Sequence, residues 1–332
     1  MSTDIDFAGA RTYAIPMTTR FRGITVREGM VFEGPAGWGE FCPFDDYDDA
    51  VSVSWLATAL EQATVGWPAP VRDRIPINCT VPAVGPDRAR KIAAASGCTT
   101  AKIKVADHPD SLPEDLARVE AVRDALGPHG ALRVDANGVW DVDTAIAHIR
   151  QLDTAAAGLE YVEQPCATID ELAAVRRRVD VRIAADESIR RAEDPMRVAV
   201  AGAADIAVIK CTPLGGVQRA LQVAEAAGLP CVVSSALETS IGLSAQLALA
   251  AALPELDYAC GLGTLSLLRG DLVADSDALR PVDGYLRVPR TPRQPSAARL
   301  DDYDLADPQR ARWWRDRLDR VRTLAAAQAH SL

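Results

Sequence analysis

Three acidic residues stand at the ends of short apolar runs in the middle of this 332-residue chain. They are Asp135, Glu163 and Asp186, separated by 28 and 23 residues, a spacing that fits one strand, one loop and one helix. If the runs are neighbouring parallel strands ~4.8 Å apart, the carboxylates converge, and they repel one another unless a cation lies among them. Oxygen ligands without His or Cys favour a hard ion, Mg²⁺ first and Mn²⁺ second. We therefore predict a metal site at these three residues.

Lysine is rare in this chain, and its positions are informative. Four of the 36 basic residues are lysine; three of them (Lys102, Lys104 and Lys210) end apolar runs, whereas Lys91 falls in a predicted helix. Arginine keeps its proton at any usable pH, but a lysine buried near another cation has a lowered pKa and can act as a base. Together, the acids and lysines predict abstraction of a proton next to a carboxylate, with the metal stabilising the resulting enediolate.

The elements that must position these residues form a regular series from about residue 75. Short apolar runs alternate with longer amphipathic stretches, which predicts parallel strand–helix units. Eight runs favour a closed α/β barrel over an open doubly wound sheet, with the chemistry at the C-terminal ends of the strands. Side chains alternate along a strand, so Lys102 and Lys104 share a face, and Lys210 lies opposite them in the ring. The runs lie at residues 75–81, 100–105, 131–136, 159–164, 181–186, 205–210, 230–235 and 258–263.

Both ends of the chain have a different pattern, typical of α+β structure. Residues 11–32 alternate like a hairpin around Gly23 and Gly29, and a helix is expected at about residues 50–64. Near the other end, residues 284–288 resemble a strand. Residues 309–329 predict a helix with one apolar face, formed by Trp314, Leu318 and Val321.

Composition excludes several classes of protein. Apolar residues make up 48% of the chain and charged residues 25%, which is ordinary for a globular protein. The net charge of −10 argues against a nucleic-acid partner. Seven cysteines without a CxxC pair favour reduced thiols and a cytoplasmic location. The first residues lack a signal-peptide pattern and no run of ~20 apolar residues occurs, so we expect no membrane insertion.

Five short motifs occur in a specific order: KIK, RVDANG, VEQP, AADES and VIK, beginning at residues 102, 133, 162, 184 and 208. In this order and spacing they resemble the muconate-cycloisomerase-like branch of the enolase superfamily, over nearly the whole chain. The resemblance implies a (β/α)7β TIM-type barrel over residues 75–283. It also implies an α+β capping domain formed by both termini, residues 1–74 and about 284–332.

Within that branch, residues 17–29, 34–49, 232–243 and 261–268 most resemble a particular group of actinobacterial enzymes. These enzymes dehydrate 2-succinyl-6-hydroxy-2,4-cyclohexadiene-1-carboxylate to 2-succinylbenzoate, a step in menaquinone synthesis. The resemblance therefore implies a lyase acting on a small-molecule dicarboxylate. It also implies that the loops near Arg20 and around residues 44–47 close over the substrate. The sequence sets no oligomeric state.

The same resemblance implies a role for each candidate site residue. Lys104 would remove the proton, Lys210 would stabilise the enediolate from the opposite face, and Lys102 would support the carboxylate and Lys104. Asp135, Glu163 and Asp186 would hold Mg²⁺, for which Mn²⁺ could substitute, with Glu187 beside them. The implied substrate-binding residues are Arg133, Asn137, Ser234, Ser235 and Gly263.

Other functions fit part of the pattern. An N-succinylamino-acid racemase, a dipeptide epimerase or a muconate cycloisomerase would use the same motifs, and Lys104 and Lys210 could act as two opposed bases. Dipeptide epimerases usually carry an Asp-x-Asp pair near the eighth strand; here that place reads Cys260-Gly261-Leu262-Gly263, which argues against an amine-bearing substrate. A non-catalytic binding barrel would be expected to lack at least one motif residue, and all five motif positions are filled.

Overall fold

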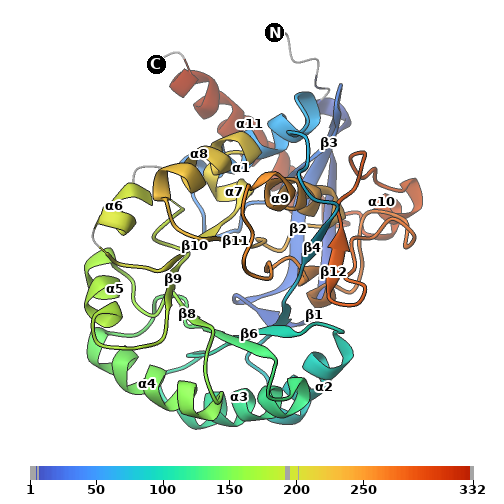
Figure 1. Ribbon diagram of the computed structural model, residues 1–332. Coiled ribbons are helices and arrows are strands. Elements are labelled where there is room, and N and C mark those ends of the chain that lie inside the picture. Colours follow the sequence, from blue (N-terminus) through green and yellow to red (C-terminus); the bar gives the residue numbers. More distant parts are fainter. Residues whose placement is uncertain (1–4, 6, 191–194, 201, 330–332) are drawn as a thin grey trace.

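Seven parallel strands form one curled sheet in this protein (Figure 1). The structure is a computed structural model that describes residues 5, 7–190, 195–200 and 202–329. The strands are hydrogen-bonded in the order β11-β10-β9-β8-β7-β6-β5. They are β5 (Cys79–Val81), β6 (Thr100–Lys104), β7 (Ala131–Asp135), β8 (Tyr161–Glu163), β9 (Ile183–Ala185), β10 (Ile206–Ile209) and β11 (Cys231–Val233).

The segment around Cys260 joins the two edges of this sheet. On one side, Cys260 N donates to Pro76 O at 2.7 Å and Asn78 N donates to Cys260 O at 3.0 Å. On the other side, Gly261 N donates to Val233 O at 2.8 Å, and Ser235 N donates to Gly261 O at 3.2 Å. The predicted α/β barrel is confirmed. Its eighth run pairs through single parallel bridges rather than as an extended strand.

Helices surround the sheet on the outside (Figure 1). Most are amphipathic; in α4, Ala145, Ile146, Ile149 and Leu152 are buried, and the Asp141 side chain caps the N-terminus by accepting from Thr144 N. By contrast, α9 is buried along nearly its whole length, because it packs against barrel strand β11 and against β3 (Gly37–Phe41) of the N-terminal sheet. The helices are α2 (Pro86–Ala95), α3 (Leu112–Leu126), α4 (Val142–Ala155), α5 (Ile169–Arg176), α6 (Pro195–Val200), α7 (Cys211–Leu214), α8 (Val217–Ala227) and α9 (Ser240–Ala252).

An antiparallel sheet of β1 (Arg11–Phe21), β2 (Ile24–Gly34) and β3 (Gly37–Phe41) lies beside the barrel, with α1 (Asp49–Thr64) packed on it. The expected hairpin turns at Arg22 and Gly23, both with positive φ. Gly29 has a different role from the one expected, because it lies inside β2. A Cβ there would be 2.6 Å from Cys42 Cβ and 2.7 Å from Tyr13 Oη, so close packing requires glycine.

The C-terminal part of the chain returns to this sheet. In α11 (Pro308–Ala329), Trp314, Leu318 and Val321 are buried, as predicted. The Trp314 ring meets Phe41 edge-on at 6.2 Å, and Trp314 Nε1 donates to Glu28 Oε2 at 2.9 Å. The domain boundaries near residues 74 and 284 remain a prediction; β4 (Arg74–Pro76) and β12 (Tyr285–Arg287) pair across them. Short elements complete this part: η1 (Phe7–Gly9), η2 (Thr264–Leu267) and α10 (Ala297–Asp302).

The barrel interior is divided into an apolar and a polar part. A buried apolar cluster is formed by Tyr161, Ala184, Ile206, Val208 and Val232. The polar side chains lie further along the same strands, at their C-terminal ends, as expected for a barrel enzyme. Among the described residues, no helix is long and apolar enough to cross a membrane.

Candidate active site

A cavity lies at the C-terminal ends of the barrel strands, between the barrel and the N-terminal sheet. Its walls bring together most of the site residues that the sequence predicts. The N-terminal part of the chain contributes Arg20, Phe21, Arg22, Phe44 and Tyr47, so both expected loops lie at the cavity. The barrel contributes Lys102, Lys104, Asp135, Asn137, Asp186, Lys210, Ser234 and Ser235.

On one side of the cavity, two lysines of β6 meet the acids of the next two strands. The register of β6 and β7 places Lys104 beside Asp135, and Lys104 Nζ lies 2.5 Å from Asp135 Oδ2. Lys104 Nζ also donates to Asn137 Oδ1 at 2.7 Å. Lys102 Nζ lies one layer deeper, 2.8 Å from Glu163 Oε1 and 3.2 Å from Asp135 Oδ2. A dense network of opposite charges therefore holds the amine of Lys104.

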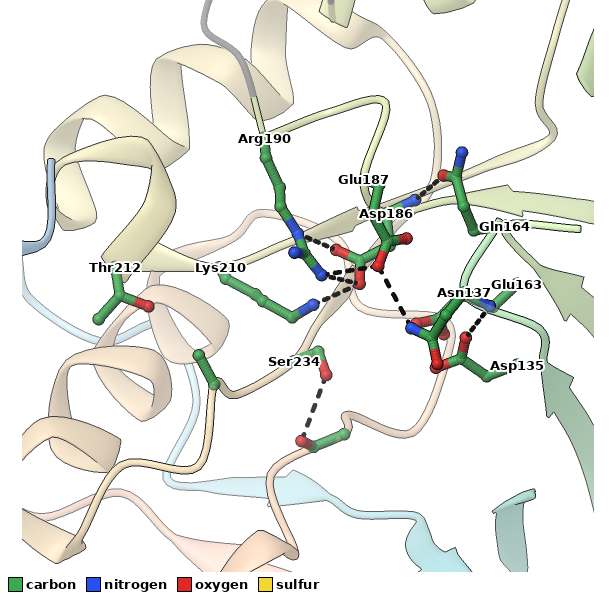
Figure 2. A network of polar contacts seen from close by, with 12 residues as sticks. Asp135, Asn137, Glu163, Gln164, Asp186, Glu187, Arg190, Lys210, Thr212 and Ser234 are labelled. Carbon is green, nitrogen blue, oxygen red and sulfur yellow. Dashed lines mark hydrogen bonds and ion pairs between the residues drawn. The ribbon is translucent and has the colours of Figure 1, made fainter. Parts of the chain in front are cut away.

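On the other side of the cavity, Lys210 and Arg190 reach Asp186 (Figure 2). Lys210 Nζ donates to Asp186 Oδ2, and Arg190 Nη2 donates to the same oxygen at 2.8 Å. Arg190 Nη2 also lies 3.0 Å from Glu187 Oε1, which accepts from Asn137 Nδ2 at 3.2 Å. Glu187 thus connects the two sides of the site. Sequence reasoning missed Arg190; the one available signal was its position four residues after an expected ligand.

Burial and these charges shift the protonation of the site. Burial, helped by the nearby charge of Asp135, raises the pKa of Glu163 to about 7. Burial also acts against ionisation of Asp135, but Lys104 and Lys102 hold its pKa below the ordinary value. Burial likewise acts against ionisation of Asp186, but Arg190 and Lys210 hold the pKa of Asp186 below its ordinary value. Two of the three carboxyl groups are therefore firmly ionised.

The two most buried lysines shift in opposite directions. Burial lowers the pKa of Lys210, and Asp186 opposes this only in part because Arg190 also lies near. Burial acts on Lys102 in the same sense, but Glu163 and Asp135 raise the pKa of Lys102 above its ordinary value. Lys102 thus remains a cation, and the carboxylate of Asp186, to which Lys210 donates, favours the charged form of Lys210 against the effect of burial.

The acid cluster fits a divalent cation by its chemistry. The Glu163 Oε2 atom is buried and has no hydrogen-bond partner, and neither does Glu187 Oε2. An unpaired buried carboxylate oxygen is costly, and a hard cation would satisfy it. Within the described part of the chain, no three acidic, His or Cys side chains already converge at ligand distances. Lysine and arginine cations supply the counter-charge to the acids instead.

The remaining predicted residues divide into two groups. Ser234 and Ser235 line the cavity: Ser234 Oγ lies 3.5 Å from Gly261 O, and Ser235 Oγ lies 2.6 Å from Thr264 Oγ1. Gly263 is a correction in position, because it is not among the residues that line the cavity. A Cβ on Gly263 would be 3.1 Å from Asn78 O, and the cavity is lined instead by Gly261 and Thr264.

Arg133 is a second correction. Its side chain is fully buried, with Nε 2.5 Å from Glu160 Oε2 and Nη1 2.6 Å from Ala259 O. Glu160 directly precedes strand β8, and Ala259 directly precedes the bridge at Cys260. Both partners therefore lie at the N-terminal ends of the strands, at the opposite end of the barrel from the cavity. Two residues along a strand span ~7 Å, which places Arg133 one layer below Asp135. Arg133 therefore does not line the cavity as expected, and a part for Arg133 in substrate binding stays a prediction.

Comparison with known proteins places this architecture in a family. Residues 86–292 match the family described as Enolase C-terminal domain-like, and residues 12–63 match Enolase N-terminal domain-like. The chain therefore belongs to the enolase superfamily. Members of this superfamily generally use a divalent metal ion and act on small molecules.

The protein is most informatively compared with two curated relatives, both named o-succinylbenzoate synthase. The protein of Thermobifida fusca is 64% identical over 280 residues, covering 84% of this chain and 87% of that protein. The protein of Mycolicibacterium smegmatis is 53% identical over 306 residues, covering 92% of each chain.

Solved structures share the fold at lower identity. The L-Ala-D/L-Glu epimerase of Bacillus subtilis is 24% identical, with a TM-score of 0.76 over 88% of this chain and 98% of that chain. The muconate lactonizing enzyme of Pseudomonas putida is 22% identical, with a TM-score of 0.73 over 91% of this chain and 99% of that chain. These two likenesses establish the architecture, and the curated relatives carry the argument about the reaction.

Proposed function

We propose that the protein is an o-succinylbenzoate synthase, which dehydrates 2-succinyl-6-hydroxy-2,4-cyclohexadiene-1-carboxylate to 2-succinylbenzoate in menaquinone biosynthesis. The observation that carries this proposal is the placement of Lys104 and Lys210 on opposite sides of one cavity, in a chain 64% identical to a protein of that name. The product is aromatic, so the reaction needs one well-placed base and stabilisation of negative charge.

The lysines account for the movement of the protons. Lys104, in its amine form, takes the proton from the carbon that bears the ring carboxylate, and the electron pair of that C–H bond passes into the carboxylate. When this pair returns to form the ring double bond, the C–O bond to the hydroxyl breaks. The ammonium group of Lys104 then gives its proton to the departing hydroxyl, which leaves as water. Substrate therefore becomes product plus one water, with no other reactant.

The other cations stabilise the negative charge that this step creates. Lys210, on the opposite face, lies where it can place positive charge beside the enediolate. Lys102 stays charged and holds Asp135 and Glu163 at 3.2 and 2.8 Å. We assign Asp135, Glu163 and Asp186 as the ligands of Mg²⁺, which Mn²⁺ can replace. When bound, the ion supplies further positive charge beside the substrate carboxylate.

Polar groups of the cavity wall suit the second carboxylate of the substrate. Ser234 and Ser235 line this part of the wall with hydroxyl groups, and Asn137 contributes an amide near Lys104. Arg20 and Arg22 add positive charge from the N-terminal part of the chain. The cavity therefore offers hydrogen-bond donors and positive charge to a small dicarboxylate. All seven cysteines are free thiols, which supports a reducing, cytoplasmic location.

A second candidate, N-succinylamino-acid racemase, is favoured by one specific observation. Lys104 and Lys210 face the cavity from opposite sides, as a two-base racemisation requires. An epimerase of dipeptides fits less well, because residues 260–263 carry no acid to bind an amino group.

In D₂O, we expect deuterium to enter N-succinylamino acids much more slowly than the same preparation dehydrates the cyclohexadiene acid. Exchange at rates equal to or above dehydration would overturn the proposed substrate.

A further inference from the structure

Arg27 is a buried cation that the proposed reaction does not use. It lies on β2, on the face of the sheet that meets the barrel, and only 2% of it is exposed. Its Nε donates to Leu237 O at 3.0 Å, and its Nη2 donates to Ala236 O at 3.2 Å and to Cys42 O at 2.5 Å. The guanidinium carbon also lies 4.4 Å from the centre of the Phe44 ring.

These partners belong to two opposite walls of the active-site cavity. Phe44 follows β3 and lines the cavity from the N-terminal part of the chain. Ala236 and Leu237 follow β11 and line the cavity from the barrel, directly after Ser234 and Ser235. One guanidinium therefore joins the two walls. Its planar fork of N–H groups is suited to holding several carbonyl oxygens in fixed relative positions.

The barrel wall at this point needs such support. Leu237 has φ +65°, in the left-handed region that a leucine rarely adopts, which makes the local conformation costly. Arg27 binds the carbonyl groups of this segment, while Glu40, from β3, binds its N–H groups. Glu40 Oε1 accepts from Thr239 N at 3.1 Å, and Glu40 Oε2 accepts from Gly242 N at 2.7 Å. A cation and an anion of the N-terminal sheet thus hold the segment from residue 236 to residue 242.

We propose that Arg27 is a positioning residue that fixes the separation of the two walls and thereby sets the affinity for the substrate. Arg27 acts on substrate through the 236–237 segment and Phe44, without itself reaching the reacting carbon. The proposal rests on the proposed function for the identity of the substrate. The physical claim, that one guanidinium keeps the 236–242 segment in its binding conformation, applies to any ligand of this cavity.

The chain offers a matched control in Arg72. Its Nη1 donates to Ala250 O at 2.7 Å and to Leu253 O at 2.6 Å, and its Nη2 donates to Pro254 O at 3.0 Å. Arg72 therefore also holds backbone carbonyls, but at the C-terminal end of α9. The 13 residues of α9 separate the two sites by ~20 Å, and Arg72 does not line the cavity.

The test compares Arg27→Met, Arg27→Lys and Arg72→Met in steady-state kinetics with the cyclohexadiene acid. We expect Arg27→Met to raise KM about tenfold or more, with kcat within about threefold of wild type, because ground-state binding is what it removes. Arg27→Lys, which keeps the charge but not the fork, should recover part of this loss. Arg72→Met should lower Tm and leave KM unchanged. An unchanged KM in Arg27→Met, a loss confined to kcat, or an equal rise in Arg72→Met would overturn the proposal.

Hydrogen exchange on the ligand-free wild type keeps the proposal testable if Arg27→Met does not fold. The amides of Thr239 and Gly242 should exchange as slowly as those in the middle of α9, and Arg27→Lys should speed exchange at residues 236–242 but not at residues 250–254. Fast exchange of Thr239 and Gly242 in the wild type would refute a preformed wall. If the wild type does not dehydrate the cyclohexadiene acid, the proposed function fails, whereas the exchange pattern still decides the role of Arg27.

Discussion

Lys104→Ala is the substitution that separates catalysis from folding most clearly. It removes an amine that lies 2.5 Å from Asp135 Oδ2 and 2.7 Å from Asn137 Oδ1. Asp135 is not left alone, because Lys102 Nζ remains 3.2 Å from Asp135 Oδ2, and Asn137 N still donates to Asp135 Oδ1 at 3.1 Å. Hydrogen bonds that involve a charged group are worth ~1.5–3 kcal/mol each, so the loss of two should cost ~3–6 kcal/mol, and we expect a loss of stability near the lower end. The variant should therefore fold.

The effect of Lys104→Ala on the rate should be much larger. A positioned general base contributes ~10²–10⁴-fold to a rate, which corresponds to about 3–5 kcal/mol of transition-state stabilisation. We expect kcat to fall by at least about 10²-fold, because the alanine side chain has no group that can accept the proton. Binding of the product, 2-succinylbenzoate, should persist, since the serines and Lys210 that line the cavity are untouched.

The assay follows aromatisation by ultraviolet absorbance, together with Tm and product binding by calorimetry. Lys91→Ala is the matched control, because Lys91 is the one lysine of the chain outside the site and is exposed on α2. Lys91→Ala should have wild-type kinetics. A Lys104→Ala protein that is folded and keeps more than about a tenth of the wild-type kcat would refute the assignment of Lys104 as the base.

Four further predictions follow from the structure. Lys210→Ala should lower kcat by about 10²-fold while Arg190 keeps Asp186 neutralised, and a near-normal kcat in the same assay would argue against Lys210 as the stabilising cation. Glu163→Gln replaces a carboxylate whose Oε2 has no hydrogen-bond partner, so the affinity for Mg²⁺ or Mn²⁺, measured by calorimetry, should fall at least about tenfold. An affinity equal to that of the wild type would remove Glu163 from the set of metal ligands. Trp314→Ala should lower the free energy of unfolding by ~3–5 kcal/mol, whereas Trp313→Ala, at a partly exposed position, should lower it far less. Equal losses for the two variants in denaturant titrations would contradict the packing described for α11. Burial raises the pKa of Cys79, Cys166 and Cys260 to about 12, which leaves little thiolate near neutral pH, so mass spectrometry should find iodoacetamide on these three cysteines only after unfolding.

The parts of the site that the sequence predicts are those that strand geometry determines. Asp135, Glu163 and Lys210 each end or directly follow a strand, so their convergence follows from a parallel barrel without knowledge of any contact. Arg133 shows the limit of this reasoning. Alternation along β7 places Arg133 on the same face as Asp135, but the depth of a residue within the barrel depends on where each strand begins, and Arg133 turns toward Glu160.

The residues that sequence reasoning missed depend on contacts between distant segments. Arg27 binds carbonyl groups 209 and 210 residues away, and no local pattern marks that pairing. Arg190 reaches Asp186 through a turn whose geometry the chain alone does not determine, and its contact with Tyr47 Oη at 3.2 Å spans 143 residues. Long-range polar contacts of this kind require the assembled fold, because they join the N-terminal sheet to the barrel.

The most direct test of the proposed function is to offer purified protein 2-succinyl-6-hydroxy-2,4-cyclohexadiene-1-carboxylate and to record the ultraviolet spectrum. With Mg²⁺ present, the spectrum should change to that of 2-succinylbenzoate over many turnovers, and the reaction should stop when a chelator is added and resume when Mg²⁺ is restored. If the folded, metal-supplied wild type forms no aromatic product, or forms it equally well after metal removal, the assignment of this cavity as a metal-dependent dehydration site is contradicted.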